Sequence, residues 1–226
     1  ATAGPVSYSP SVDANRFDQR QRYLDAMHLI RTSQFTRLQK VKPNLRSYAL
    51  YPYLEYTEMT YRISRQSVED ILAFIEQHSD TPLVEPLVQH WLKNLAKRGQ
   101  WHTFLTHYES LVNGGRIGST RDLACHYGFA LYKNGLREQT FNQAEKLWLV
   151  GYSQPDSCDP IFQVWRGADG ITRELAWERL ALSLKENEKK LSSYLLRFIH
   201  KEDKTLASNY RLVHLKPRTI KRYKSF

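Results

Sequence analysis

The apolar residues of this chain recur with the spacing of an α-helix almost throughout, and short polar turns interrupt them. Four stretches keep the i, i+3, i+4, i+7 spacing that lines one face of a helix. They are residues 68–75, 84–95, 123–131 and 191–198. No stretch of useful length shows the alternation typical of a half-buried strand. The pattern therefore predicts an all-α protein.

Capping and breaking residues support the predicted helix ends. Ser67 and Asp70 stand where a capping pair belongs, immediately before and within the first turn of the first stretch. Pro82 precedes the second stretch and Gly99 follows it, the usual places for these residues. Gly135 stops the third. These signals predict separate helices.

The polar turns between the helices are short. They are residues 97–101, 133–136 and 185–188. Such turns suit antiparallel helix pairs, and each pair must bury its apolar face on the next. Their spacing is uneven and no residue consensus repeats. We expect a right-handed superhelix, or α-solenoid, of irregular helical hairpins, forming a single domain over residues 13–226.

The first twelve residues differ in composition from the rest. Residues 1–12 hold Gly4, two prolines and several serines, and predict a flexible N-terminal arm. The chain has neither an initiator Met nor a charged-then-apolar leader, so a secretory signal would have been removed or never included.

Charge and hydrophobicity bound the class of partner. Lys and Arg outnumber Asp and Glu by 33 to 23, and the formal net charge is +10. This excess favours polyanions: nucleic acid, an acidic membrane face or an anionic cell-wall polymer. No apolar run approaches the roughly 18 residues of a membrane-spanning helix, so no membrane span is expected.

Several patterns superficially suggest cofactor or metal chemistry. Residues 114–118 (GGRIG) lack the Gly-Lys-Ser/Thr of a phosphate loop and the strand that precedes a dinucleotide fingerprint. We interpret them as a helix connection. His90, His102, His107 and His126 lack the spacing and companions of zinc ligands. We therefore expect no cofactor-binding and no metal-binding residues.

Two arrangements could suggest catalysis. Cys125 and His126 are adjacent on a predicted helix, so their side chains diverge and cannot form a nucleophile–base pair. The carboxylate pairs Glu55 with Glu58 and Glu69 with Asp70 have the close spacing of glycosidase acids. Their surroundings are polar, so we interpret them as solvated faces or caps.

The basic segment at residues 216–224 carries one aromatic and is compatible with phosphate contacts and base stacking. It is equally typical of a solvated helix. The other basic residues are spread over many helices and no recognised motif accompanies them, so nucleic-acid binding is the less favoured hypothesis.

Cys125 and Cys158 are the only cysteines. A helix over residues 136–149 would return the chain and bring them together. A bridge would place the protein in an oxidising compartment, and it would stabilise the fold by about 3 to 4 kcal/mol. The alternative, two small buried apolar side chains, stays open on these grounds.

Two strings resemble a known family. Residues 48–56 (YALYPYLEY) and 145–166 (EKLWLVGYSQPDSCDPIFQVWR) resemble the N-terminal region of the soluble lytic murein transglycosylases of the Gram-negative periplasm. The similarity looks collinear from about Phe17 to at least Leu182. Trp91, Trp101 and Cys125 stand in corresponding contexts.

The resemblance implies a superhelical region of helical hairpins. In the whole enzyme this region surrounds a lysozyme-like catalytic domain that cleaves the MurNAc–GlcNAc bond and leaves 1,6-anhydromuramoyl ends. It also implies a disulfide between Cys125 and Cys158, and a periplasmic location after signal removal.

The family's catalytic motifs find no match. Its Glu-Ser motif is followed by Gly-Leu-Met-Gln, and no such order occurs here. Glu109 and Ser110 are a decoy without that sequel. We expect no catalytic residues, an absent lysozyme-like domain and a chain that is not itself an enzyme, whether as a fragment or as a naturally short relative.

The leading hypothesis is a non-catalytic scaffold that meets peptidoglycan glycan strands, its own missing catalytic domain and other cell-wall proteins. A competing hypothesis is a helical-repeat module in the periplasm that binds another protein. A basic nucleic-acid binder is third.

Overall fold

The computed structural model describes residues 10–222 and forms two compact units, unit 1 (Ala1–Asn94) and unit 2 (Leu95–Phe226). The described residues contain helices and no strand. None of these helices is both long enough and apolar enough to cross a lipid bilayer. Each unit is described separately, and the single domain expected over residues 13–226 stays a prediction.

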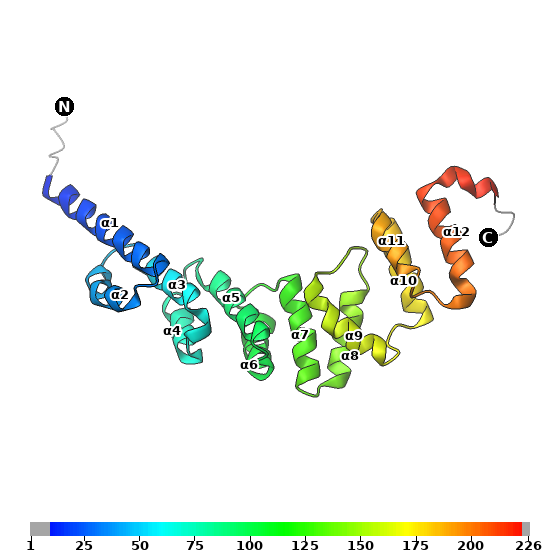
Figure 1. Ribbon diagram of the computed structural model, residues 1–226, viewed down its shortest axis with the longest axis horizontal. Coiled ribbons are helices and arrows are strands. Elements are labelled where there is room, and N and C mark those ends of the chain that lie inside the picture. The colour runs from blue at the N-terminus through cyan, green and yellow to red at the C-terminus, as the bar shows by residue number, and fades with distance from the viewer. Residues whose placement is uncertain (1–9, 223–226) are drawn as a thin grey trace, which may run out of the picture. The chain divides into compact units, whose positions relative to one another are not determined.

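In unit 1, helices α2 and α3 and the turn between them pack against the C-terminal half of α1 (Figure 1). Its helices are α1 (Pro10–Arg31), α2 (Phe35–Val41), α3 (Tyr51–Tyr61), α4 (Val68–Gln77) and α5 (Val84–Lys97), which crosses the unit boundary. Ala26 and Ile30 of α1 are fully buried against Leu38, Leu45 and Leu54. Neighbours in sequence thus provide the apolar surface that α1 needs.

The predicted capping pair of α4 is confirmed. The Ser67 hydroxyl accepts a hydrogen bond from the Asp70 backbone N–H at 3.0 Å, and the Asp70 carboxylate accepts one from the Ser67 backbone N–H. This capping box satisfies two donors that a helix start leaves without partners. Ile71, Phe74 and Ile75 form the buried face of the helix.

Unit 2 is a succession of hairpins in which α6, α7, α8 and α9 pack on their neighbours in sequence, α10 packs on α11, and α12 packs on α10. Its helices are α6 (Trp101–Tyr108), α7 (Arg121–Lys133), α8 (Arg137–Trp148), α9 (Asp159–Gly167), α10 (Arg173–Lys185), α11 (Lys189–Leu195) and α12 (Lys204–Leu215). A π-helical turn, η3 (Glu109–Asn113), extends α6. Three 3-10 turns flank later helices: η4 (Asp156–Cys158) precedes α9, η5 (Lys201–Asp203) precedes α12, and η6 (Pro217–Arg222) follows α12. The three predicted polar turns join α5 to α6, α7 to α8 and α10 to α11.

One apolar core runs through unit 2 from α7 to α12. Cys125, Trp148, Trp165, Leu180 and Ala207 are among its buried members. Trp148 is 2% exposed, and the rings of Phe162, Trp165 and Phe198 meet its ring edge to face. The fold class expected from the sequence, an all-α solenoid of irregular hairpins, is confirmed.

Two expected boundaries need correction. The flexible arm was expected over residues 1–12, but α1 begins at Pro10; residues 1–9 lie outside the described residues. Proline suits a first turn because the N–H that it lacks would have no helical partner there. The last apolar stretch was expected to reach Phe198, but α11 ends at Leu195. Phe198 instead packs its ring against Trp148 at 5.1 Å, so tertiary packing ends the helix early.

We expect Gly151→Ala to destabilise unit 2 by about 1–3 kcal/mol, because added volume in a packed site forces neighbours apart. A Cβ at Gly151 would lie 2.6 Å from the Leu182 carbonyl oxygen, which is backbone and cannot rotate away. Gly167→Ala is the matched control, since a Cβ there meets nothing within 4 Å. Urea denaturation followed by circular dichroism measures both. Equal stability of the two variants would contradict the packing argument.

A second prediction concerns acid stability. The Asp203 carboxylate accepts hydrogen bonds from the Arg173 guanidinium and from Trp177 Nε1, and these bonds lower the pKa of Asp203. The stabilisation is complete above the unfolded pKa of about 3.9 and is lost as pH falls through the lower folded pKa. Asp203→Asn should lower the urea midpoint at neutral pH. As the pH is lowered toward about 3, the midpoint of this variant should also fall less than that of the unaltered chain. An unchanged pH profile would show that the pair does not contribute.

Candidate functional site

Helices α7, α8 and α9 of unit 2 border a surface pocket. Thr120 caps α7, since its hydroxyl accepts a hydrogen bond from the Leu123 backbone N–H at 3.3 Å. Gly135 ends the turn between α7 and α8 with a φ of +79°, a conformation that glycine adopts without strain. Asn134 ties the same turn to α7, its amide donating to the Ala130 carbonyl at 2.8 Å.

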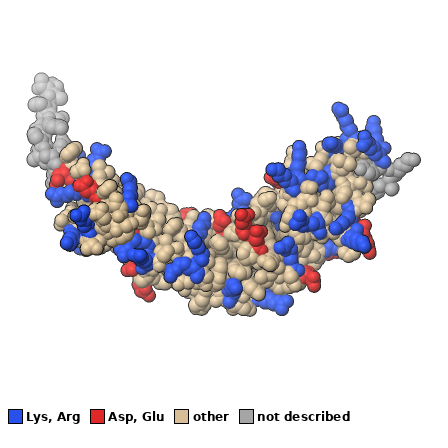
Figure 2. All heavy atoms as spheres, in the orientation of Figure 1, with Lys and Arg blue, Asp and Glu red and all other residues tan. Residues whose placement is uncertain are grey.

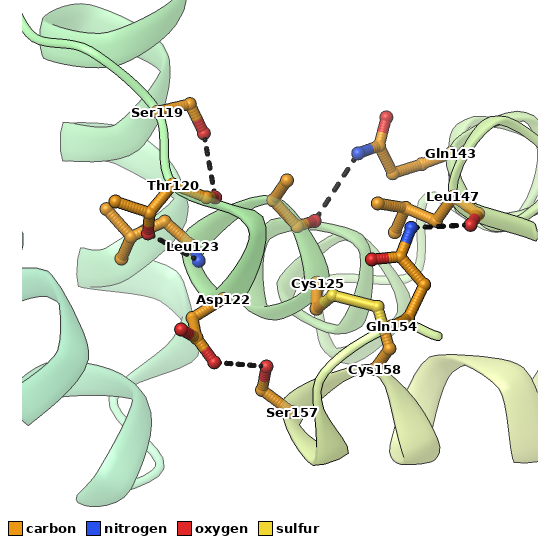
Figure 3. Close-up of a disulfide and its surroundings, with 11 residues drawn as sticks. Ser119, Thr120, Asp122, Leu123, Cys125, Gln143, Leu147, Gln154, Ser157 and Cys158 are labelled. Atoms are coloured by element: carbon orange, nitrogen blue, oxygen red, sulfur yellow. Dashed lines mark hydrogen bonds between the residues drawn. A yellow bond between two sulfur atoms is a disulfide. The ribbon is translucent and has the colours of Figure 1, made fainter. Parts of the chain in front are cut away.

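A disulfide joins α7 to the start of α9 (Figure 3). It links Cys125 to Cys158, and both residues are fully buried. Beside it, the Ser157 hydroxyl donates a hydrogen bond to the Asp122 carboxylate at 2.8 Å. The first turn of α9 is thereby held against α7 by a covalent bond and a hydrogen bond. Of the two alternatives that the sequence left open, the structure has the bridge.

Two amide side chains hold α8 in the same arrangement (Figure 3). Gln143 Nε2 donates to the Ala124 carbonyl of α7 at 3.3 Å. Gln154 Nε2 donates to the Leu147 carbonyl of α8 at 2.7 Å. Gln143 therefore ties α8 to α7, and Gln154 ties the loop between α8 and α9 to α8; we call these three helices the three-helix platform.

A pocket of about 630 Å³ opens on this platform, and we call it the α7–α9 groove. It is lined by Tyr132, Gly135, Arg137, Phe141, Gln163, Val164, Gly167 and Ala168. Three helices thus contribute aromatic rings, one guanidinium and one amide. None of these lining residues is acidic.

Cations lie close to aromatic rings in the groove and beside it. The Arg137 guanidinium lies 5.2 Å from the centre of the Phe141 ring, and Lys133 Nζ lies 5.2 Å from that of Phe129. Phe129 and Tyr132 stack with their centres 5.9 Å apart. Aromatic faces can contact the C–H groups of a sugar ring, while guanidinium and amide groups bond hydroxyl and acetamido oxygens. The groove can bind a polar, ring-containing ligand.

The glycine-rich loop, residues 114–118, is a helix connection as predicted. It follows η3 and precedes α7, with no strand before it. Gly115 has a φ of +77°, and the Ile117 backbone N–H donates to the Leu111 carbonyl at 2.9 Å. The loop therefore closes the preceding helix.

The four histidines do not gather into a metal site among the described residues, which hold no group of three or more potential ligands. His102 Nδ1 lies 3.2 Å from the Asn134 side-chain oxygen, and His126 lies among the rings of Trp101 and Phe104. Burial lowers the pKa of His107. Cys125 is part of the disulfide and cannot act as a nucleophile with His126.

The interpretation of Glu55 and Glu58 as solvated residues is wrong. Glu58 is only 5% exposed, and Lys42 Nζ and Gln39 Nε2 each donate to its carboxylate at 2.8 Å. Glu55 approaches Lys42 at 3.5 Å and His78 at 3.2 Å. Sequence spacing did not reveal this network because α2 and the following turn, η1 (Lys42–Leu45), supply the partners.

Lys42 responds to these carboxylates. Burial by itself would lower its pKa, but the hydrogen bond and charge of Glu58, together with the charge of Glu55, outweigh that effect and raise it. The pair is therefore an ionic tie within unit 1. Both oxygens of the Glu58 carboxylate accept hydrogen bonds from side chains of unit 1.

The remaining acidic candidates lie at the surface. Glu69 and Asp70 are exposed, and Asp70 is the cap predicted for α4. Glu109 and Ser110 are exposed on the π-helical turn, where Glu109 accepts a long hydrogen bond from the Tyr127 hydroxyl. The expectation of no catalytic residue stays a prediction.

Positive charge is concentrated near the end of unit 2. Residues 185–222 hold eleven Lys and Arg against four Asp and Glu. Figure 2 shows these basic side chains over α11 and α12. The predicted basic segment, residues 216–224, lies within this region. Residues 216–222 are mostly exposed, and all but the first of them form η6. Residues 223 and 224 lie outside the described residues.

Sequence reasoning missed the groove residues. Tyr132, Arg137, Phe141 and Gln163 show no spacing that distinguishes them from ordinary surface residues. The predicted turn at Gly135 was the available signal, because it places the end of one helix beside the start of the next. The contribution of α9 depends on the disulfide and could not be inferred from spacing.

Comparison with known proteins gives a consistent result. Soluble lytic murein transglycosylase from Escherichia coli K12 is 30% identical over 220 residues, which are 97% of this chain and 32% of that protein. The Salmonella typhimurium protein of the same name is 31% identical over 84% of this chain and 29% of its own length. No protein-family model matches the chain.

Solved structures agree. The 70-kDa soluble lytic transglycosylase from Escherichia coli superimposes with a TM-score of 0.75 and 28% identity, over 90% of this chain and 32% of that one. An inactive mutant of Slt from Pseudomonas aeruginosa gives a TM-score of 0.75 and 30% identity over 88% of this chain and 31% of its own. The chain is similar to one region of soluble lytic murein transglycosylases. It spans about a third of the length of these relatives, and its helices fit their superhelical region.

The disulfide should stabilise unit 2 by about 3–4 kcal/mol, because it closes a loop with a sequence separation of 33 in the unfolded chain. Cys125→Ser with Cys158→Ser should lower the urea midpoint to that of the reduced protein. Denaturation with and without reductant checks this. The double variant is its own control, since reductant should not affect it; an oxidised protein no more stable than the variant would refute the estimate.

Proposed function

We propose that this chain is a non-catalytic scaffold of a peptidoglycan lytic transglycosylase and that it contacts glycan strands. The observation that carries the proposal is the similarity to soluble lytic murein transglycosylases along 97% of the chain. The whole enzyme would cleave the MurNAc–GlcNAc bond and leave 1,6-anhydromuramoyl ends. The catalytic domain would lie in the part of the enzyme that this chain does not span.

The α7–α9 groove is the proposed contact with glycan. Its rings, guanidinium and amide suit a sugar, and the absence of acidic groups from its lining suits binding without bond cleavage. The net positive charge favours approach to a polymer whose peptides carry carboxylates. These features support a surface that confines a strand for a catalytic domain elsewhere.

Location follows from the same proposal. Peptidoglycan is assembled outside the cytoplasmic membrane, and a disulfide persists in oxidising compartments such as the bacterial periplasm. We therefore place the protein in the periplasm of a Gram-negative bacterium, after removal of a signal peptide. Other cell-wall proteins and the enzyme's own catalytic domain are its proposed partners.

Sedimentation with purified sacculi tests the groove. Tyr132→Ala should weaken binding about fivefold, since an aromatic contact contributes about 1 kcal/mol. Tyr53→Ala is the matched control: both tyrosines are 43% exposed, and Tyr53 lies in unit 1. Equal loss in both variants, or in neither, would reject the groove as the glycan contact.

The same incubation tests the non-catalytic assignment. Chromatography of the soluble fraction should find no anhydromuropeptides after prolonged incubation of sacculi with the chain. Their release would overturn the assignment. Failure of the unaltered chain to sediment with sacculi at low salt would reject a direct contact with peptidoglycan.

A further inference from the structure

A second pocket of unit 2 contains a buried cation without an anionic partner. The pocket has a volume of about 310 Å³ and lies among α8, the loop that follows it, and helices α9, α10 and α11. We call it the Arg179 pocket. Trp148, Gln154, Asp159, Arg179, Lys190 and Tyr194 are among its lining residues, none of which lines the α7–α9 groove.

Arg179 is 4% exposed, and its guanidinium carbon lies 3.9 Å from the centre of the Trp148 ring. Phe162 provides a second ring at 5.7 Å. Among the described residues, no carboxylate forms an ion pair with Arg179, and its Nε has no hydrogen-bond acceptor. Burial lowers the pKa of Arg179 to about 10, so the side chain remains cationic at neutral pH. Buried charges in proteins are ordinarily paired, and this one has only aromatic faces.

Two neighbouring polar atoms are also unsatisfied. Trp148 Nε1, a donor, and Gln154 Oε1, an acceptor, are buried without hydrogen-bond partners within the described structure. Gln154 is held in place because its Nε2 donates to the Leu147 carbonyl at 2.7 Å. Three such atoms around one pocket call for an explanation, since native structures satisfy nearly all buried polar groups.

The charge of the lining selects the ligand. Arg179 and Lys190 are cationic, and Asp159 is the one acidic residue in the lining. Lys190 and Asp159 are exposed, so water screens their charges, whereas the field of the enclosed Arg179 is little screened. Arg179 is among the residues that line the pocket, and its guanidinium also carries two terminal nitrogens side by side. Their planar geometry matches the two oxygens of a carboxylate.

We propose that the Arg179 pocket binds the C-terminal carboxylate of a short peptide. The last residue of a peptide carries a carboxylate for Arg179 and, two bonds away, an amide N–H that can satisfy an acceptor such as Gln154. The volume of about 310 Å³ lies at the lower end for ligand sites, which suits one or two amino-acid residues. That the peptide is a peptidoglycan stem rests on the proposed function.

Calorimetric titration with N-acetyl-D-alanyl-D-alanine tests the proposal on the unaltered chain. The C-terminal amide of the same peptide and sodium acetate are the comparison ligands. We expect the free peptide acid to bind at least tenfold more tightly than the peptide amide and at least tenfold more tightly than acetate. Equal binding of the amide would overturn the role of the carboxylate, equal binding of acetate would overturn the recognition of a peptide, and no binding of the acid would overturn the site.

Substitution tests the residue. Arg179→Met keeps most of the volume and removes an uncompensated buried charge, so the fold should be no less stable while peptide binding falls at least tenfold. Arg197→Met is the matched control, because Arg197 also stacks on a ring, that of Tyr194 at 4.2 Å, but is exposed and does not line the pocket. Equal peptide binding by Arg179→Met and the unaltered chain would overturn the proposal. Should Arg179→Met fail to fold, Arg179→Lys keeps the charge without the planar geometry and should still bind at least tenfold more weakly than the unaltered chain.

The outcome is separable from that of the proposed function. Sacculus binding through the groove is measured with Tyr132→Ala, a residue outside the Arg179 pocket. Loss of peptide selectivity with intact, Tyr132-dependent sacculus binding would reject only the Arg179 pocket. Selective binding of the free peptide acid without sacculus binding would support the pocket and reject the proposed glycan contact.

Discussion

The packing around Trp148 is the interaction on which unit 2 depends. Its ring is met edge to face by Phe162 and Trp165 of α9 and by Phe198 beyond α11, and it carries the guanidinium of Arg179 from α10. One side chain at the end of α8 therefore contacts α9, α10 and the segment that follows α11. A hairpin cannot bury its apolar face alone, and this cluster is where neighbouring hairpins supply the missing surface.

Local sequence signals predicted the helices well and the sites poorly. The Ser67–Asp70 cap, the turn at Gly135 and the spacing of residues 84–95 each depend on residues within a few positions, and the structure confirms them. The start of α1 at Pro10 was missed because proline is as common in a loop as in the first turn of a helix, and the end of α11 was missed because Phe198 packs on the distant Trp148. Such information lies outside any short window of sequence.

For polar residues, too, the local sequence does not show which distant segment packs on them. Glu58 has the spacing of a surface residue, yet it is buried by partners from α2 and η1 that precede it by 16 and 19 positions. Arg179 lies in the middle of α10, and nothing near it in sequence indicates that its guanidinium lies over a tryptophan ring. Spacing reports which face of a helix a residue occupies. The segment that packs on that face decides whether the residue forms a buried ion pair, lines a binding pocket or stays exposed to water.

Helix α9 connects the two proposed binding surfaces. Consecutive residues point to different sides of a helix, so Phe162 lines the Arg179 pocket while Gln163 lines the α7–α9 groove. The disulfide sets the position of both, because Cys158 immediately precedes α9 and is bonded to α7. If the proposed function holds, the sugars of one polymer contact the α7–α9 groove while its peptide carboxylate contacts the Arg179 pocket, both beside α9. Two weak contacts made by one molecule bind far more tightly than either contact alone.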